Sequence, residues 1–217
     1  MIQSISNAVA SLDEDQTLEL VRFHLDNGVS SKEILESVQQ GMEQVGMLYE
    51  KQAFFLADLI MAGIIFKEVL KLDEMQLSIQ KKIKNGFKPV ILIGTVRGDL
   101  HDIGKDIFSG MAISAGYEII DIGVDVSAEK FILAYQQHNP DIIALSGVLS
   151  ESLQQMKKTI GLFRQTDLAK QVYIIVGGRA VNKDNYTVTG ADAYSSEIKA
   201  GLETCDAWIQ QKYGDFR

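Results

Sequence analysis

The segment Lys88-Pro-Val-Ile-Leu-Ile-Gly94, followed by Thr95-Val-Arg-Gly-Asp-Leu-His-Asp-Ile-Gly-Lys105, decides how the chain is organised. The first part is short and rich in β-branched and aliphatic residues, which predicts a buried strand. The residues from Ile107 to Ala115 predict a helix. Asp99 and His101 then lie on the loop that leaves a parallel strand, which is where open α/β sheets bind ligands.

Downstream of this segment, apolar runs alternate with amphipathic segments, which is typical of a parallel sheet with helices on both faces. The predicted strands are Pro89–Ile93, Glu118–Ile122, Ile142–Ser146, Val172–Val176 and Ala191–Tyr194. The predicted helices are Ile103–Ala115, Ala128–Gln137, Leu153–Thr166, Ala180–Val188 and Glu197–Tyr213. The spacing predicts an α/β fold of the flavodoxin-like (Rossmann-like) type, with a five-stranded parallel sheet in the order 2-1-3-4-5 and a ligand crevice beside the first and third strands.

Upstream of the sheet, the residues 1–86 predict four helices joined by short loops, as in an up-and-down bundle. The expected helices are 2–12, 13–25, one that begins at the capping box Ser30-Ser-Lys-Glu33, and 54–83. The second helix should end at Asn27-Gly28, a good C-terminal signal. We therefore expect two domains, a helical cap domain at 1–86 and a ligand-binding α/β domain at 87–217.

The first half of the fourth predicted helix, from Phe54 to Phe66, is apolar around nearly its whole circumference, with Asp58 as its only charge. A helix in a small bundle should leave one face polar. Either this helix is central to the bundle, or one apolar side meets the second domain, a subunit or a bulky ligand.

The composition limits the kind of protein. The 217 residues allow one or two domains with real cores, and 46% hydrophobic with 23% charged residues is ordinary for a globular protein. A net charge of −8 argues against a nucleic-acid surface. No apolar run approaches the roughly 20 residues of a membrane helix, and the N-terminus lacks a secretory signal. The single Cys205 excludes an internal disulfide framework and a cysteine-cluster metal site. We expect a cytoplasmic protein without nucleic-acid or membrane partners.

Notable residues follow three of the predicted strands: the His101 loop, the segment from Ser146 to Ser152, and Gly177-Gly178. The carboxyl ends of parallel strands share one edge of the sheet, so these segments should gather there. A core would not place its special residues on one edge, whereas a ligand site would.

His101 could be a metal ligand, a general base or a helix-entry residue without chemistry. Asp99 could hold one imidazole nitrogen and leave the other free, as is usual for a metal-ligating His. His24 and His138 lie on predicted helix surfaces, so no second His is at hand. A conventional zinc or iron site needs three or four protein ligands. A lone His therefore suits a metal whose other ligands belong to a cofactor.

Two other interpretations of the edge remain open. Asp102, Asp106, Asp121 and Asp125 could form a magnesium or phosphoacceptor site, although Gly94 and Thr95 stand where an acidic pair would be expected. The Gly177-Gly178 pair could let backbone approach a bulky ligand or could form a tight turn. No phosphate-binding or dinucleotide-binding glycine motif follows the first strand.

The spacing of these residues resembles the signature of cobalamin-binding proteins, Asp-x-His-x-x-Gly, then Ser-x-Leu, then Gly-Gly. In this chain Asp99, His101 and Gly104 are followed by 41 residues (105–145) and then by Ser146-Gly-Val148. A further 28 residues (149–176) lead to Gly177-Gly178. Val148 in place of Leu is the one departure, and it is a small apolar change.

The resemblance extends over essentially the whole chain. The two modules together are similar to the corrinoid-binding unit of methionine synthase. They are more similar to the free-standing corrinoid proteins of methyltransferase systems that demethylate methylamines, methanol, methoxylated aromatics or betaines. In that family the helix matching the one that begins at Phe54 caps the upper face of the corrin. Ala57 stands where the family often has Pro, and Asp106 where it often has Asn.

The resemblance also implies roles for single residues. Cobalamin would bind with its benzimidazole tail off the cobalt and buried beside the sheet. His101 would be the lower axial metal ligand, with Asp99 on its other nitrogen and the Ser152 hydroxyl completing the relay; Ser150 lies near enough to be an alternative. The implied catalytic residues are His101, Asp99 and Ser152. Ser146, Val148, Gly177 and Gly178 would line the tail slot, and the full implied cofactor-binding set is Asp99, His101, Asp102, Ile103, Gly104, Ser146, Val148, Leu149, Ser150, Gly177 and Gly178.

The implied function is the methyl-carrier component of a cobalamin-dependent methyltransferase system, which takes a methyl group on Co(I) and passes it on from methylcobalamin. The implied partners are a substrate-specific methyltransferase, a second methyltransferase that uses tetrahydrofolate or coenzyme M as acceptor, and a reductive activase for Co(II). The alternatives are a cobalamin-responsive regulator and the small subunit of an adenosylcobalamin-dependent mutase, which generally lacks the helical cap. An FMN-binding flavodoxin-like domain is a further alternative, against which the missing Ser/Thr-rich phosphate loop argues.

Overall fold

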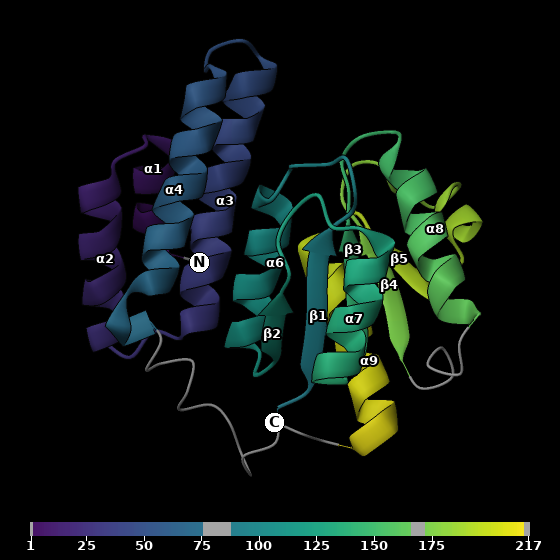
Figure 1. Cartoon of the computed structure of the whole chain (residues 1–217). Coiled ribbons are helices and arrows are strands. Elements are labelled where there is room, and N and C mark those ends of the chain that lie inside the picture. The colour runs from purple at the N-terminus through teal and green to yellow at the C-terminus, as the bar shows by residue number, and fades with distance from the viewer. Residues whose placement is uncertain (1, 76–87, 166–171, 215–217) are drawn as a thin grey trace. The chain divides into compact units, whose positions relative to one another are not determined.

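The structure is a computed structural model that describes residues 2–75, 88–165 and 172–214. The chain divides into two compact units, Met1–Ile83 and Lys84–Arg217 (Figure 1). The domain boundary expected at residues 86 and 87 lies outside the described residues. No helix within the described ranges is long and apolar enough to cross a membrane.

The first unit consists of helices whose ends are set by local capping. Its helices are α1 (Gln3–Ala10), α2 (Glu14–Asp26), α3 (Ser31–Glu50) and α4 (Leu56–Lys71). The Asp13 carboxylate accepts a hydrogen bond from the Gln16 N–H at the start of α2. At the start of α3 the predicted capping box is present, with Ser30 and Glu33 each bonded to the other's backbone N–H. The buried apolar side chains of this unit include Ile5, Val9, Val21, Ile34, Leu35, Val38, Val45, Ile65 and Phe66.

The helix predicted over 54–83 begins two residues later than expected and is interrupted at Leu72, so the prediction of one continuous helix is wrong. The helix begins at Leu56 because the Asp58 carboxylate accepts the Phe55 N–H at 2.7 Å and so caps the first turn. It ends at Lys71, since Leu72 has an extended backbone (ψ 130°). A new helical turn covers residues 73–75, beginning at an Asp, which is favoured in first turns. The remainder of the predicted helix lies outside the described residues.

The second unit contains the five-stranded parallel sheet, in the order β2-β1-β3-β4-β5. The predicted fold class and strand order are therefore confirmed. The strands are β1 (Val90–Thr95), β2 (Glu118–Asp121), β3 (Ile142–Ser146), β4 (Tyr173–Gly177) and β5 (Ala193–Ser195). The central strands β1, β3 and β4 are buried along nearly their whole length, as expected for strands covered on both faces.

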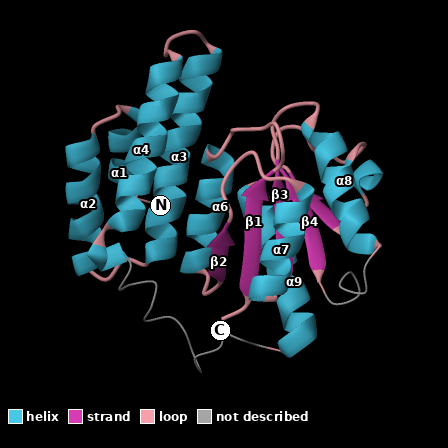
Figure 2. Cartoon of the chain, viewed as in Figure 1, coloured by secondary structure: helices cyan, strands magenta, loops and turns pink. Residues whose placement is uncertain are grey.

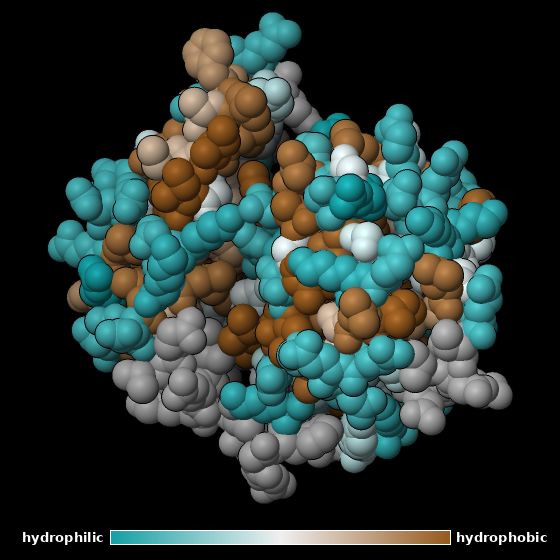
Figure 3. Space-filling view, viewed as in Figure 1, coloured by the Kyte–Doolittle hydropathy of each residue, from teal (hydrophilic) through white to brown (hydrophobic). Residues whose placement is uncertain are grey.

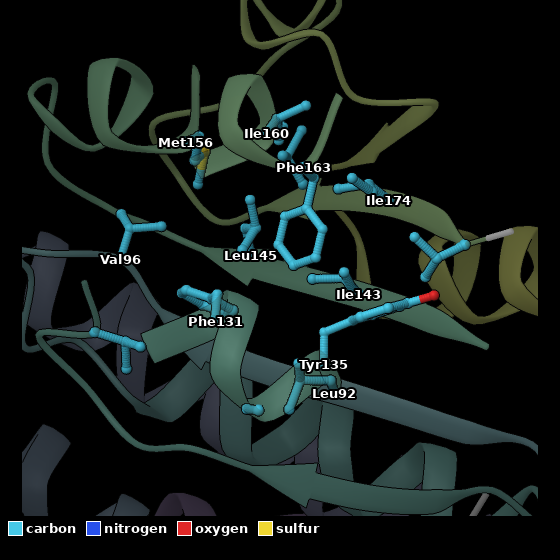
Figure 4. Close-up of a cluster of buried hydrophobic side chains, with 14 of the residues drawn as sticks. Leu92, Val96, Phe131, Tyr135, Ile143, Leu145, Met156, Ile160, Phe163 and Ile174 are labelled. Carbon is cyan, nitrogen blue, oxygen red and sulfur yellow. The ribbon is translucent and has the colours of Figure 1, made fainter. Parts of the chain in front are cut away.

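Two helices cover each face of the sheet (Figure 2). Helices α7 (Ala128–His138) and α8 (Ser152–Arg164) pack together on one face, and α6 (Ile103–Ser114) and α9 (Ile198–Tyr213) pack together on the other. Beneath α7 and α8, alternate residues of β1, β3 and β4 meet helix side chains in a buried apolar cluster (Figure 4). Within it the rings of Tyr135 and Phe163 meet edge to face, 5.5 Å apart.

The prediction of a helix at Ala180–Val188 is wrong. The structure has turns there, and then the short 3-10 helix η2 (Tyr186–Thr189). The Asn182 side chain accepts hydrogen bonds from the N–H groups of Asp184 and Asn185, and the Asn185 amide donates to the Ala180 carbonyl. These side chains take up the backbone groups that an α-helix would have paired, which is why Asn and Asp favour turns.

Candidate functional site

The predicted site residues gather at the carboxyl edge of the sheet, on the loops after β1, β3 and β4. Asp99 and His101 lie on the β1–α6 loop, and Asp102, Ile103 and Gly104 form the start of α6. Ser146 ends β3, and Val148, Leu149 and Ser150 lie on the loop before α8, which Ser152 begins. Gly177 ends β4 and Gly178 follows it.

Asp99 is the centre of this arrangement, and its side chain is fully buried. Its Oδ2 accepts hydrogen bonds from the Ser152 hydroxyl at 2.6 Å and from the N–H groups of Val148 at 2.7 Å and Leu149 at 3.1 Å. Its Oδ1 accepts the backbone N–H of His101 at 3.1 Å and lies 2.7 Å from Nδ1 of the same residue. A single carboxylate thus joins the loops that follow β1 and β3.

These hydrogen bonds keep the Asp99 carboxylate charged. Burial alone would raise its pKa, but the hydrogen bonds from Ser152, Val148 and His101 outweigh that penalty and hold the pKa well below its usual range. An ionised carboxylate can only accept hydrogen bonds, so Nδ1 of His101 must carry the proton that joins them. In the neutral imidazole Nε2 then has a free lone pair, and this side chain is 55% exposed. Asp99 therefore fixes the orientation of the His101 ring and the tautomer that leaves Nε2 unprotonated.

Of the two candidate hydroxyls, it is Ser152 that reaches Asp99. Ser152 is buried in the first turn of α8, whereas Ser150 is exposed on the preceding loop. Sequence reasoning did not assign Thr95, which is also buried and whose hydroxyl donates to the His101 carbonyl at 2.9 Å. A polar residue as the last member of an otherwise apolar strand was the signal that could have drawn attention to it.

The glycines at the edge let the loops after β3 and β4 touch. Gly178 has a positive φ of 99°, and a Cβ there would lie 2.3 Å from the Gly147 carbonyl oxygen. A Cβ on Gly147 would lie 2.5 Å from the Cβ of Ser152. The tight-turn interpretation of the Gly177-Gly178 pair is thus sufficient to explain Gly178. The absence of a side chain at Gly147 lets Ser152 stay within hydrogen-bonding distance of Asp99.

Gly104 is different, because no atom of the protein requires it. A Cβ there would meet nothing within 4 Å, although Gly in a helix costs about 0.5–1 kcal/mol relative to Ala. The loops after β1 and β3 and the start of α6 also carry apolar side chains that face solvent: Leu100 is 71% exposed, Leu149 40% and Ile103 36%. Leu100 was missed in the sequence, where an apolar residue directly before the key His was the available signal. The loops therefore present one imidazole nitrogen amid an open apolar surface.

The magnesium interpretation of the acidic residues is wrong. The buried ammonium of Lys105 donates to both Asp106 and Asp121, so each of these carboxylates already has a cationic partner within the protein. Asp125 accepts the Gly98 N–H and pairs with Arg97. Within residues 2–75, 88–165 and 172–214, no group of three or more His, Cys, Asp or Glu could hold a metal ion.

In the helical unit, α4 has one apolar face without a cover. Ile65 and Phe66 are buried against the other helices, as are Ala62 and Val69. Figure 3 shows apolar side chains over the neighbouring ends of α3 and α4. The exposed large ones on these helices and the turn between them are Met47, Tyr49, Phe55, Leu56, Ile60, Met61 and Ile64. Apolar surface on this scale usually marks a binding surface.

The fold and the site together define a class of protein: an α/β protein that presents a single protein ligand for a metal held by a large, flat, mostly apolar group. The fit rests on the exposed imidazole of His101, on the exposed apolar Leu100, Ile103 and Leu149 of the same edge, and on the open space at Gly104. A corrinoid meets these requirements, because its own ring supplies most of the ligands to its metal.

Comparison with known proteins agrees with this class. Residues 89–200 match the B12 binding domain family, and residues 1–72 match a second family with the same description. The chain is 35% identical to dimethylamine corrinoid protein 3 of Methanosarcina acetivorans, over 93% of both chains. The chain therefore belongs to the family of B12-binding corrinoid proteins, and the predicted resemblance and the predicted cofactor, cobalamin, are confirmed.

Solved structures give the same result. A cobalamin-binding protein from Desulfitobacterium hafniense is 32% identical, with a TM-score of 0.60 over 96% of this chain and 98% of that one. The monomethylamine corrinoid protein of Methanosarcina barkeri has a TM-score of 0.73 over 93% and 94% of the two chains. At 24% identity this second likeness supports the fold alone.

Proposed function

We propose that this protein carries a methyl group on the cobalt of a bound cobalamin, from a substrate-specific methyltransferase to a second methyltransferase. The observation that carries the proposal is His101, whose Nδ1 is held by an ionised Asp99 while its Nε2 side is exposed beside an apolar surface. When bound, the cobalamin supplies a nucleophilic cobalt that can accept a methyl group and release it again.

The protein's own residues would hold the cofactor and adjust the axial bond. Nε2 of His101 would be the lower axial ligand, and Asp99 would stabilise the imidazole in the required tautomer. Ser152 and the N–H groups of Val148 and Leu149 would keep the carboxylate in place against His101. An imidazole binds metal only through an unprotonated nitrogen, so the tautomer that Asp99 favours is the one that can bind.

The remaining predicted residues would bind the rest of the cofactor. Ser146, Val148, Gly177 and Gly178 would line the slot for the benzimidazole tail, in the α/β domain at 87–217. Asp102, Ile103, Gly104, Leu149 and Ser150 would contact the lower side of the corrinoid. What supports these roles is that all of these residues lie at the carboxyl edge of the sheet, beside Asp99 and His101.

The helical unit at 1–86 would act as the cap. Its exposed apolar surface on α3 and α4, which includes Phe55, Leu56 and Ile60, has the chemistry needed to exclude water from the upper side of the cofactor. A cap of this kind must move aside when a partner enzyme delivers or removes the methyl group.

The names of the relatives favour a methylated amine as the methyl donor, since one of them at 35% identity is a dimethylamine corrinoid protein. The acceptor, tetrahydrofolate or coenzyme M, would be chosen by the second methyltransferase. A reductive activase for Co(II) completes the proposed set of partners, and we place the whole system in the cytoplasm.

Reconstitution tests the proposal. The purified protein is incubated with hydroxocobalamin, separated from free cofactor by gel filtration and examined by absorption spectroscopy, beside the His101→Gly variant. We expect both to retain cobalamin through the tail slot, with the imidazole-on spectrum in the wild type alone and its recovery in the variant on adding free imidazole. A colourless wild type, or identical spectra, would remove the proposed site. Tighter retention of adenosylcobalamin than of methylcobalamin would favour the mutase-subunit alternative instead.

A further inference from the structure

The loop that carries His101 is hydrogen-bonded to the loop between β2 and α7, through Asp125. The Asp125 carboxylate accepts the Gly98 N–H at 2.8 Å, and its own N–H donates to the Asp99 carbonyl at 3.0 Å. The next residue, Val126, forms a parallel bridge with Val96. Val96, Gly98 and Asp99, which precede His101, are thus all bonded to the segment Asp125-Val126.

The backbone of Asp125 is set for these contacts. Its φ of 53° lies in the left-handed region, which costs most residues about 1 kcal/mol or more and which Asp and Asn tolerate best. Gly98, which donates its N–H to the Asp125 carboxylate, also has a positive φ, of 80°. A non-glycine residue in this region needs surrounding interactions to hold it there. The contacts with Gly98 and Asp99 are the interactions that do so.

The contact that matters most is the hydrogen bond to Gly98, rather than the ion pair with Arg97. Nε of Arg97 lies 3.3 Å from the carboxylate, but the two side chains are 61% and 43% exposed, so solvent screens the pair. A hydrogen bond to an ionised acceptor is stronger than one between neutral groups, and the Gly98 N–H is a fixed backbone donor.

We propose that Asp125 is a positioning residue for the axial ligand: by holding Gly98 and the Asp99 carbonyl, it fixes the loop that aims Nε2 of His101. This inference rests on the proposed function. The Asp99–His101 hydrogen bond sets the tautomer, and the hydrogen bonds from Ser152, Val148 and Leu149 tie Asp99 to the segment after β3 alone. Asp125 supplies a second restraint, from a strand and loop that do not otherwise enter the site.

Four holoprotein variants test the assignment. Asp125→Gly removes the acceptor and accepts the left-handed backbone without strain, and Asp125→Asn keeps a neutral acceptor oxygen and tolerates the same backbone. Arg97→Gln removes only the exposed ion pair. Asn139→Gly is the matched control for backbone freedom, because Asn139 is also left-handed (φ 45°) but caps the far end of α7.

The readout is the midpoint potential of the Co(II)/Co(I) couple of the bound cobalamin, measured by spectroelectrochemistry. An axial imidazole stabilises Co(II), so a weaker His101 bond raises the potential. We expect Asp125→Gly to weaken that bond about tenfold, which is about 59 mV, and Asp125→Asn about threefold, which is about 28 mV. Arg97→Gln and Asn139→Gly should stay within about 10 mV of the wild type on the same scale.

Electron paramagnetic resonance of the Co(II) form distinguishes failure of this inference from failure of the proposed function. An axial nitrogen splits each cobalt hyperfine line into three when it is 14N and into two when it is 15N. We expect three lines in the unlabelled wild-type protein, and two when its histidines carry 15N in the imidazole ring. If the splitting does not change in this way, or if His101→Gly has the wild-type potential, the proposed function fails and this inference with it. If the 15N splitting and the potential of His101→Gly are as expected, but Asp125→Gly has the midpoint potential of the wild type, the inference alone is overturned. Should Asp125→Gly not fold, Asp125→Asn decides, and an unshifted potential overturns the assignment.

Discussion

Asp99→Asn is the sharpest test of the site, because the substitution keeps the shape of the side chain and removes one acceptor. The carboxylate accepts three hydrogen bonds at Oδ2, from Val148, Leu149 and Ser152, and two at Oδ1, both from His101. The introduced amide should keep its oxygen toward the three donors and turn its NH2 toward His101. The hydrogen bond from the His101 N–H, worth about 1.5 kcal/mol, is then lost, and the three donors at the amide oxygen meet a neutral acceptor in place of a charged one. We therefore expect about 3 kcal/mol less free energy of unfolding.

The same substitution should reverse the tautomer of His101. The introduced NH2 group donates toward Nδ1, which must then accept, and the hydrogen of the neutral imidazole moves to Nε2. No lone pair remains there for cobalt. We therefore expect the Asp99→Asn holoprotein to retain cobalamin but to lose the imidazole-on spectrum, as His101→Gly does.

Stability is measured by urea unfolding, followed by the fluorescence of Trp208. It is the only Trp of the chain, and its ring stacks on Tyr173 in the α/β unit, with centroids 4.7 Å apart. Ser152→Ala is the control, because it removes one hydrogen bond to the carboxylate, worth about 1.5 kcal/mol, and leaves the tautomer unchanged. An Asp99→Asn variant with wild-type stability and a wild-type spectrum would refute the reasoning.

Four further predictions concern the pH dependence of stability, two glycines and the helical unit. Since the folded-state pKa of Asp99 is lowered, its contribution to stability should be complete above about pH 4 and be lost as the pH falls further, and urea midpoints of wild type and Asp99→Asn should converge in acid. Gly178→Ala should cost about 3 kcal/mol, because a left-handed backbone and a close backbone oxygen oppose the Cβ. Gly104→Ala should stabilise the apoprotein by up to about 1 kcal/mol yet reduce cobalamin retention after gel filtration. In thermal unfolding of the helical unit, Ile60→Ser should change the stability by less than about 0.5 kcal/mol, and Ile65→Ala should lower it by about 2–5 kcal/mol.

Much of the fold could be predicted because its signals are local. The capping box at Ser30 and Glu33 and the C-terminal signal at Asn27-Gly28 set helix ends within a few residues of themselves. The apolar runs of β1 and β3 predicted buried parallel strands for the same reason. The predictions failed where side chains compete with the backbone. Asn182 and Asn185 replaced an expected helix with turns, and such competition depends on geometry that periodicity does not contain.

The sequence by itself determined the order of strands and helices, the edge of the sheet where Asp99, His101 and Ser152 would gather, and the spacing that marks the cobalamin-binding family. Only the tertiary structure decided what holds that site in place. The acceptors and donors that pair there are far apart in the chain: the Asp99 carboxylate with the N–H of Val148, and the Gly98 N–H with the Asp125 carboxylate. A hydrogen bond needs its atoms within about 3 Å of one another. For residues this distant in sequence, only the register of the folded sheet brings them so close.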